Sequence, residues 1–175
     1  TTVRSLRWRP GEITAAVRDP DHADREVTAS RAVITLPLGV LKAPPGAPGA
    51  ILMEPEPPGW SDALRALEMG AAHRIVLRFD SAWWQRPDAP PVSFIHGPGS
   101  AFPVWWVAAQ EDAPHLTGWC GGPRATSLAG RAPEVMRQAA VDSLAVTFGR
   151  PAREIADRIR GAHHHDWVLD PLSLG

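Results

Sequence analysis

Residues 74–79 have the sequence RIVLRF, in which every second side chain, from Ile75 to Phe79, is apolar and the two charged residues are four positions apart. Successive side chains of a strand point to opposite faces, so this pattern predicts a strand with one wholly apolar face. The apolar face consists of Ile75, Leu77 and Phe79, and the opposite face consists of Arg74, Val76 and Arg78. We therefore expect a strand that packs its apolar face against a hydrophobic core.

Other segments add strands and helices around this strand. Alternating or β-branched runs predict strands at residues 2–8, 13–18, 32–36, 92–95, 104–108 and 116–120, with a hairpin turn at Pro10-Gly11 and a further turn at 19–25. Helical spacing predicts helices at 61–69, 133–148 and 152–159. The expected core stripe of the long helix is Val135, Ala139, Leu144 and Phe148, and its expected end is Gly149. For the helix at 61–69, the expected N-cap is Ser61 and the expected end is Gly70.

Together these elements predict an α+β fold, in which helices cover a mixed β-sheet and a small β-rich strip accompanies it. The run at residues 32–36, AVITL, is apolar almost throughout, which is typical of a strand buried on both faces. Six prolines lie within residues 43–59. Because Pro fixes φ and removes a backbone donor, we expect an extended crossing segment and a boundary there.

The overall composition is that of an ordinary globular domain. The 175 residues are 44% hydrophobic and 21% charged, which allows one domain with a real core. A net charge of -1 gives no electrostatic reason to expect nucleic acid or an anionic membrane as a partner. No apolar run approaches the ~20 residues that a bilayer span needs. Cys120 is the only cysteine, which excludes an internal disulfide and is typical of a reducing compartment, so we expect a cytoplasmic protein.

The two ends of the chain favour a piece of a longer protein. The first residue is Thr1 rather than Met, and the last residues, DWVLDPLSLG, stop at Gly175 without a natural tail. We therefore expect an internal fragment. Such a fragment exposes apolar surface that its missing half would cover, and we expect that surface to favour self-association.

Four segments, in order along the chain, carry a family resemblance. They are VITLPLGVLK at 33–42, LEMG with RIVLRF and WW at 67–84, LTGWCGGPRA at 116–125, and HDWVLDP at 165–171. Together they resemble the flavin-containing amine oxidases, which include monoamine oxidases, polyamine oxidases and flavin-dependent histone demethylases. The resemblance implies that residues 1–42 are partial strands of an FAD-binding domain. It implies a substrate-binding domain at 43–163 and a truncated return segment toward the FAD-binding domain at 164–175.

The sequence lacks the turn that binds a dinucleotide. A G-x-G-x-x-G turn between a strand and a helix presents backbone N–H groups to the pyrophosphate, but Gly97-Pro98-Gly99 lacks the third glycine and predicts a loop. The resemblance places this turn before Thr1 and the last cofactor contacts after Gly175. We therefore expect FAD in the intact parent, completed by the missing N-terminal half. The fragment alone is expected to lack FAD and to be inactive.

The resemblance also implies a reaction and its residues. Family enzymes oxidise a C–N bond of a small-molecule amine by hydride transfer to the flavin, and dioxygen usually reoxidises the flavin. The implied cofactor contacts are Val3 at the adenine portion, Thr35, Leu36 and Pro37 at the edge of the FAD-binding domain, and Trp167 beside the flavin ring. The catalytic candidate is Arg74, which stands where the family usually has a water-holding Lys. Because Arg cannot give up its proton, Arg74 would orient a water or bind an acidic group, or else be a solvated strand residue.

Three other interpretations are considered. The histidines at 163–165 suggest a metal, but adjacent side chains of a strand diverge and no Cys pair assists, so we expect no metal site. The eight tryptophans would suit a non-catalytic ligand-binding module. A sister flavoenzyme, such as a desaturase or a protoporphyrinogen oxidase, is a further alternative.

Overall fold

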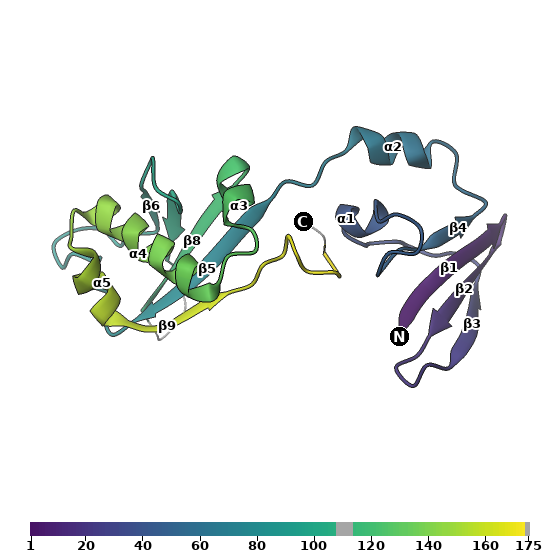
Figure 1. Cartoon of the computed structure of the whole chain (residues 1–175), viewed down its shortest axis with the longest axis horizontal. Coiled ribbons are helices and arrows are strands. Elements are labelled where there is room, and N and C mark those ends of the chain that lie inside the picture. Colours follow the sequence, from purple (N-terminus) through teal and green to yellow (C-terminus); the bar gives the residue numbers. More distant parts are fainter. Residues whose placement is uncertain (108–113, 174–175) are drawn as a thin grey trace. The chain divides into compact units, whose positions relative to one another are not determined.

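The computed structural model describes residues 1–107 and 114–173, which form two compact units (Figure 1). Unit 1 consists of Thr1–Met69 and Val168–Gly175, and unit 2 consists of Gly70–Trp167. Each unit has its own β-sheet. In the described residues, no helix is long and apolar enough to cross a membrane.

Unit 1 is built on a four-stranded sheet with the strand order β3-β2-β1-β4. Its strands are β1 (Thr2–Arg9), β2 (Glu12–Arg18), β3 (Asp24–Ala29) and β4 (Leu52–Glu54). The predicted hairpin is confirmed: β1 and β2 pair antiparallel, and Gly11 takes the positive φ of 83° at the turn. β4 lies parallel to β1, so the pairing in this sheet is mixed.

Strand β3 is not predicted by the sequence. The turn expected at 19–25 covers its first two residues, Asp24 and Arg25. All its residues are exposed, and its sequence, DREVTA, is too polar to show the alternation of a half-buried strand. Ion pairs across the ladder accompany the backbone pairing: Arg18 contacts Asp24 at 2.7 Å, and Arg7 contacts Glu26. The information for this strand therefore lies in its partner β2 rather than in its own sequence.

The predicted strand at 32–36 is wrong. These residues have no regular secondary structure and are exposed, with Val33 87% exposed, and no backbone–backbone hydrogen bond joins residues 31–36 to another described residue. A buried strand needs neighbouring strands that pair with it as well as apolar side chains, and no described strand pairs with this segment. The short helix α1 (Leu38–Leu41) follows it directly.

The first predicted helix is shorter than expected. Helix α2 (Trp60–Ala66) begins one residue earlier, with Gly59 in the left-handed region as its N-cap in place of Ser61. It ends at Leu67, which is already extended, so Gly70 is not the residue that stops it. The hydroxyl of Ser61 instead donates to the Glu56 carboxylate at 2.8 Å.

Unit 2 holds a five-stranded antiparallel sheet with the strand order β6-β7-β8-β5-β9. Its strands are β5 (Ala72–Phe79), β6 (Phe94–His96), β7 (Val104–Trp106), β8 (His115–Gly121) and β9 (Ile159–His164). The predicted strands at 74–79 and 116–120 are confirmed, and those at 92–95 and 104–108 are displaced or shortened. Ala108, the end of the last of these, lies outside the described residues.

Three helices cover one face of this sheet, as Figure 1 shows: α3 (Pro123–Leu128), α4 (Pro133–Phe148) and α5 (Ala152–Arg158). The predicted apolar face of β5 is buried in a core that also contains Leu116 and Trp105. Helix α4 has the predicted bounds and ends at Gly149, but Val135 is 47% exposed. Its buried residues are Met136, Ala140, Val141, Ser143 and Leu144, a stripe rotated by about one position. The chain therefore has the predicted α+β class.

Candidate functional site

The face of the unit 2 sheet that faces away from the helices carries aromatic and cationic side chains. We call it the open face. The cross-strand register puts Arg74 opposite Trp119, Val76 opposite Thr117 and His163, Thr117 opposite Trp106, and Trp106 opposite Phe94. Directly paired residues point to the same face of a sheet, so these side chains form one continuous surface. None of them belongs to the buried core cluster of the described residues.

Trp119 is the part of the open face that lies beside Arg74, and a glycine allows its position. A Cβ added to Gly121 would lie 2.7 Å from a carbon of the Trp119 indole, so the ring rests directly over this glycine. The side chain nevertheless remains 40% exposed. The result is an accessible aromatic surface placed against the strand.

Arg74, the catalytic candidate, is exposed on this face, and its side chain has no hydrogen bond or ion pair with another described residue. Arg78, two strand positions further on the same side, donates to the carbonyl of Arg160 at 3.4 Å. The two arginines therefore differ: Arg78 is tied to β9, whereas the guanidinium of Arg74 is available to a ligand.

The second candidate surface is an apolar pocket of about 530 Å³ in unit 1. Its lining includes Val3, Leu6, Ala15, Ala32, Val33, Ile34, Thr35, Leu36, Val40, Ile51 and Leu172. Three of the cofactor residues implied by the resemblance, Val3, Thr35 and Leu36, thus lie along one cavity. Pro37 follows them as the N-cap of α1, and its carbonyl accepts the Leu41 N–H at 3.1 Å.

Backbone groups at this pocket lack strand partners. β4 pairs only with residues 5–7 of β1, so the same edge of β1 at residues 2–4 has no partner strand among the described residues. Residues 32–36 also line the pocket, and no backbone–backbone hydrogen bond joins their N–H and C=O groups to another described residue. Aliphatic walls beside free backbone donors and acceptors suit a flat heteroaromatic ring, and so fit the adenine portion of FAD. They do not supply a pyrophosphate turn.

Trp167, the fifth implied cofactor residue, belongs to unit 2. It is 48% exposed, and its ring meets that of His165 edge to face with centroids 4.4 Å apart. An exposed indole supported by a neighbouring ring is free to take a further contact on its other face. Its contact with a flavin stays a prediction.

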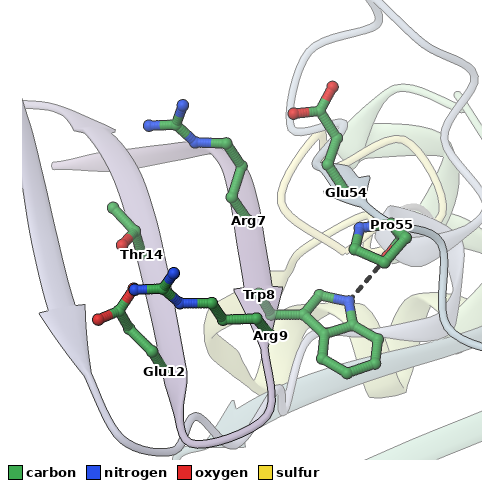
Figure 2. Close-up of a pocket in the computed structure, with 7 residues that line it drawn as sticks. All are labelled: Arg7, Trp8, Arg9, Glu12, Thr14, Glu54 and Pro55. Carbon is green, nitrogen blue, oxygen red and sulfur yellow. Dashed lines mark hydrogen bonds and ion pairs between the residues drawn. The ribbon is translucent and has the colours of Figure 1, made fainter.

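Another hollow of about 520 Å³ lies on the sheet of unit 1 (Figure 2). Its lining residues are Arg7, Trp8, Arg9, Glu12, Thr14, Glu54 and Pro55. The Trp8 indole N–H donates to the Pro55 carbonyl at 2.7 Å, and Arg9 pairs with Glu12 at 2.8 Å (Figure 2). Because these groups contact one another and Arg7 pairs with Glu26, the hollow is a weaker ligand candidate than the open face.

A buried histidine pair was missed by the sequence reasoning. His73 on β5 is fully buried, and its Nδ1 lies 3.1 Å from Nε2 of His164 on β9. Burial, and then the neighbouring His73, lowers the pKa of His164 below its ordinary value. Among the described residues no group of three metal-ligand side chains could hold a metal ion. The pair lies on the helix-covered face, so it is a structural feature rather than part of the open face.

The fold and the two surfaces define a two-unit α+β protein with an apolar pocket in one unit and an aromatic, cationic sheet face in the other. A family profile described as flavin containing amine oxidoreductase matches residues 1–175, so the chain belongs to this family.

Similar proteins agree with this assignment. Probable polyamine oxidase 4 of Arabidopsis thaliana is 41% identical over 68 residues, which are 38% of this chain and 12% of that protein. Polyamine oxidase 3 of Oryza sativa subsp. japonica is 40% identical over 68 residues, with the same coverage. The chain spans only a small part of these curated relatives.

Solved structures show the same fold. Wild-type putrescine oxidase bound to putrescine matches with a TM-score of 0.75 and 18% identity, over 99% of this chain and 35% of that one. Cyclohexylamine oxidase from Brevibacterium oxydans matches with a TM-score of 0.73 and 18% identity, over 99% and 35%. The chain therefore spans about a third of these structures.

Proposed function

We propose that the chain is part of an FAD-dependent oxidoreductase that oxidises a C–N bond of a small-molecule amine, with dioxygen as the final acceptor. The observation that carries the proposal is the family match over the whole chain, together with the pocket that collects Val3, Thr35 and Leu36. Family membership favours this function over a tryptophan-rich binding module. Trp84 and Trp105 are also core residues, 4% and 0% exposed, and so are not ligand-facing.

In this proposal unit 1 supplies an edge of the cofactor site. Val3 and the segment 31–37 would hold the adenine portion by aliphatic contacts and unpaired backbone groups. Residues outside this chain would hold the pyrophosphate and add the strands that segment 31–36 lacks. The 175 residues alone would then bind FAD too weakly to retain it, because a few contacts do not offset the ordering of a long ligand.

Unit 2 would supply the substrate surface. The bound flavin would accept a hydride from the substrate carbon. The open face would cover the substrate, exclude water and fix the orientation of the amine. Arg74 would hold a water or an acidic group with a charge that does not titrate, and Trp167 would pack beside the flavin ring. A cytoplasmic location, based on the lone Cys120, is part of the proposal.

The experiment is anaerobic addition of amines to the purified full-length gene product that contains this chain. We expect bound FAD, bleaching of its visible absorbance by at least one amine, and peroxide on readmission of air. A preparation without FAD, or FAD that no amine reduces while a chemical reductant does, would contradict the proposal. Separately expressed, the 175-residue chain is expected to be colourless.

A further inference from the structure

The chain just beyond β9 is held on both sides of one histidine. His164 is the last residue of β9, and its Nε2 lies 3.1 Å from Nδ1 of the fully buried His73. Two residues further on, the Asp166 carboxylate accepts the Gly130 N–H, in the turn between α3 and α4, at 2.7 Å. The residue between these two anchors is His165. Its backbone is therefore tied to the rest of unit 2 from both directions.

The imidazole of His165 lies against the indole of Trp167. The ring centroids are 4.4 Å apart and the ring planes meet at 64°. Burial alternates over residues 165–167, exposed, half-buried and exposed, as it does along a strand, so the two rings lie on the same side of the chain. Such an edge-to-face arrangement is favourable, because the electropositive edge of one ring meets the electronegative face of the other.

Little else fixes the orientation of Trp167. The residue is 48% exposed. In the described part of the chain its indole N–H donates no hydrogen bond, and His165 supplies its one ring contact. An exposed side chain without such a contact exchanges among its rotamers on the ps–ns timescale. The His165 ring therefore limits the orientations that the indole takes.

We propose that His165 is a positioning residue: its imidazole, held between the two anchors, orients Trp167 so that the free side of the indole is preset for the flavin ring. The inference rests on the proposed function, in which Trp167 packs beside the flavin, and adds the residue that prepares this contact. A side chain that is already ordered loses little rotamer freedom when the cofactor binds, so the contact is stronger. His165 acts through Trp167 rather than on the reacting atoms.

The test uses the full-length gene product and four single variants. His165→Ala removes the ring, and His165→Phe keeps a flat ring but removes both ring nitrogens. Trp167→Leu removes the indole on which His165 acts. The matched control is His22→Asn, which removes an exposed imidazole between β2 and β3. Asn also tolerates the positive φ of 67° at that position.

Two readouts report on the contact without any turnover. The first is the visible absorbance spectrum of the bound flavin, which changes when a neighbouring ring moves. The second is the Kd of FAD, obtained from the quenching of FAD fluorescence when the deflavinated protein is titrated with FAD.

We expect His165→Ala to change the flavin spectrum in the same direction as Trp167→Leu. We expect it to weaken FAD binding by about two- to tenfold, the factor that one aromatic pair contact represents. His165→Phe and His22→Asn should match the wild-type protein in both readouts, because the first keeps the ring contact and the second lies outside it.

A double variant separates positioning from any other role of the imidazole. If His165 acts through Trp167, its loss has no further effect once the indole is gone. Trp167→Leu combined with His165→Ala should therefore have the same spectrum and the same Kd as Trp167→Leu alone.

The inference is overturned if His165→Ala keeps the wild-type spectrum and Kd, or if His165→Phe is as impaired as His165→Ala. A further loss in the double variant would also overturn it. If Trp167→Leu itself changes neither readout while amines still reduce the flavin, the inference fails and the proposed amine oxidation stands. A full-length protein that binds no FAD would overturn both.

Discussion

Two glycines of strand β8 offer a matched test of the packing on the two faces of the unit 2 sheet. A Cβ on Gly118 would lie 2.7 Å from the Trp105 indole, and a Cβ on Gly121 would lie 2.7 Å from the Trp119 indole. The two substitutions therefore create the same clash. They differ in the freedom of the ring, because Trp105 is 0% exposed and Trp119 is 40% exposed.

We expect Gly118→Ala to destabilise the chain by about 1–3 kcal/mol, the usual cost of one extra methyl group in a well-packed core. Neither glycine has a positive φ, so no backbone strain is removed or added. Gly121→Ala should cost no more than about 0.5 kcal/mol, because the Trp119 ring can swing into solvent.

Urea unfolding of the wild-type chain and the two variants, followed by tryptophan emission and by circular dichroism, measures the difference. In the native state, Gly121→Ala should change the emission spectrum, since Trp119 moves, with little change in the unfolding midpoint. Equal stability of the two variants would refute the assignment of the two faces, and so would a larger loss in Gly121→Ala.

Three further predictions follow from the same contacts. Because the folded state lowers the pKa of His164 through burial and His73, the folded chain binds fewer protons than the unfolded chain just below the ordinary pKa of about 6.5. Stability should therefore be complete above that pH and fall as the pH drops below it, and His164→Gln should flatten this dependence in urea titrations at pH 5 to 8. Val33 and Leu172, 87% and 78% exposed beside the apolar pocket, should promote self-association, so Val33→Ser should lower the weight-average mass in sedimentation, whereas equal masses would count against it. In the full-length protein, Arg74→Met should slow flavin reduction in stopped-flow measurements and lower the reduction potential of the flavin. Arg74→Lys should restore part of the rate and add a pH dependence, because Lys can titrate whereas Arg does not. Unchanged rates and potentials in both variants would remove Arg74 from the site.

Elements whose signal lies within their own residues could be predicted from the sequence. β5 alternates strictly, and α4 combines helical spacing with Pro133 at its start and Gly149 at its end, so both were placed well. Two errors show where the sequence signal is not local: a strand was expected at 32–36 and is absent, and β3 is present but was not expected. An apolar run does not form a ladder without partners, and a polar run does when its neighbour supplies pairing and ion pairs.

For the candidate sites, single residues could be named from the sequence, but the pairs that they form could not. The family resemblance singled out Arg74, within the motif RIVLRF, and Val3, outside the quoted motifs. The pairing of Arg74 with Trp119 depends on the register of β5 and β8, which no local pattern contains. His73 and His164 are 91 positions apart and meet only because β9 lies beside β5. The cofactor contacts of Val3, Thr35, Leu36, Pro37 and Trp167 stay predictions, although the first three share a pocket.

The central claim is that unit 1 forms part of an FAD site at the pocket beside Val3. It is tested most directly by the FAD content of the purified full-length gene product, measured by absorbance after denaturation, for the wild-type protein, Val3→Asp and Val27→Asp. Val27 is a 43% exposed valine on β3 of the same sheet, outside the pocket, and serves as the control. We predict one FAD per wild-type and Val27→Asp chain, and a marked loss in Val3→Asp, because a buried carboxylate beside an apolar ring is unfavourable. A wild-type protein without FAD, or a Val3→Asp variant that keeps its full FAD content, would contradict the claim.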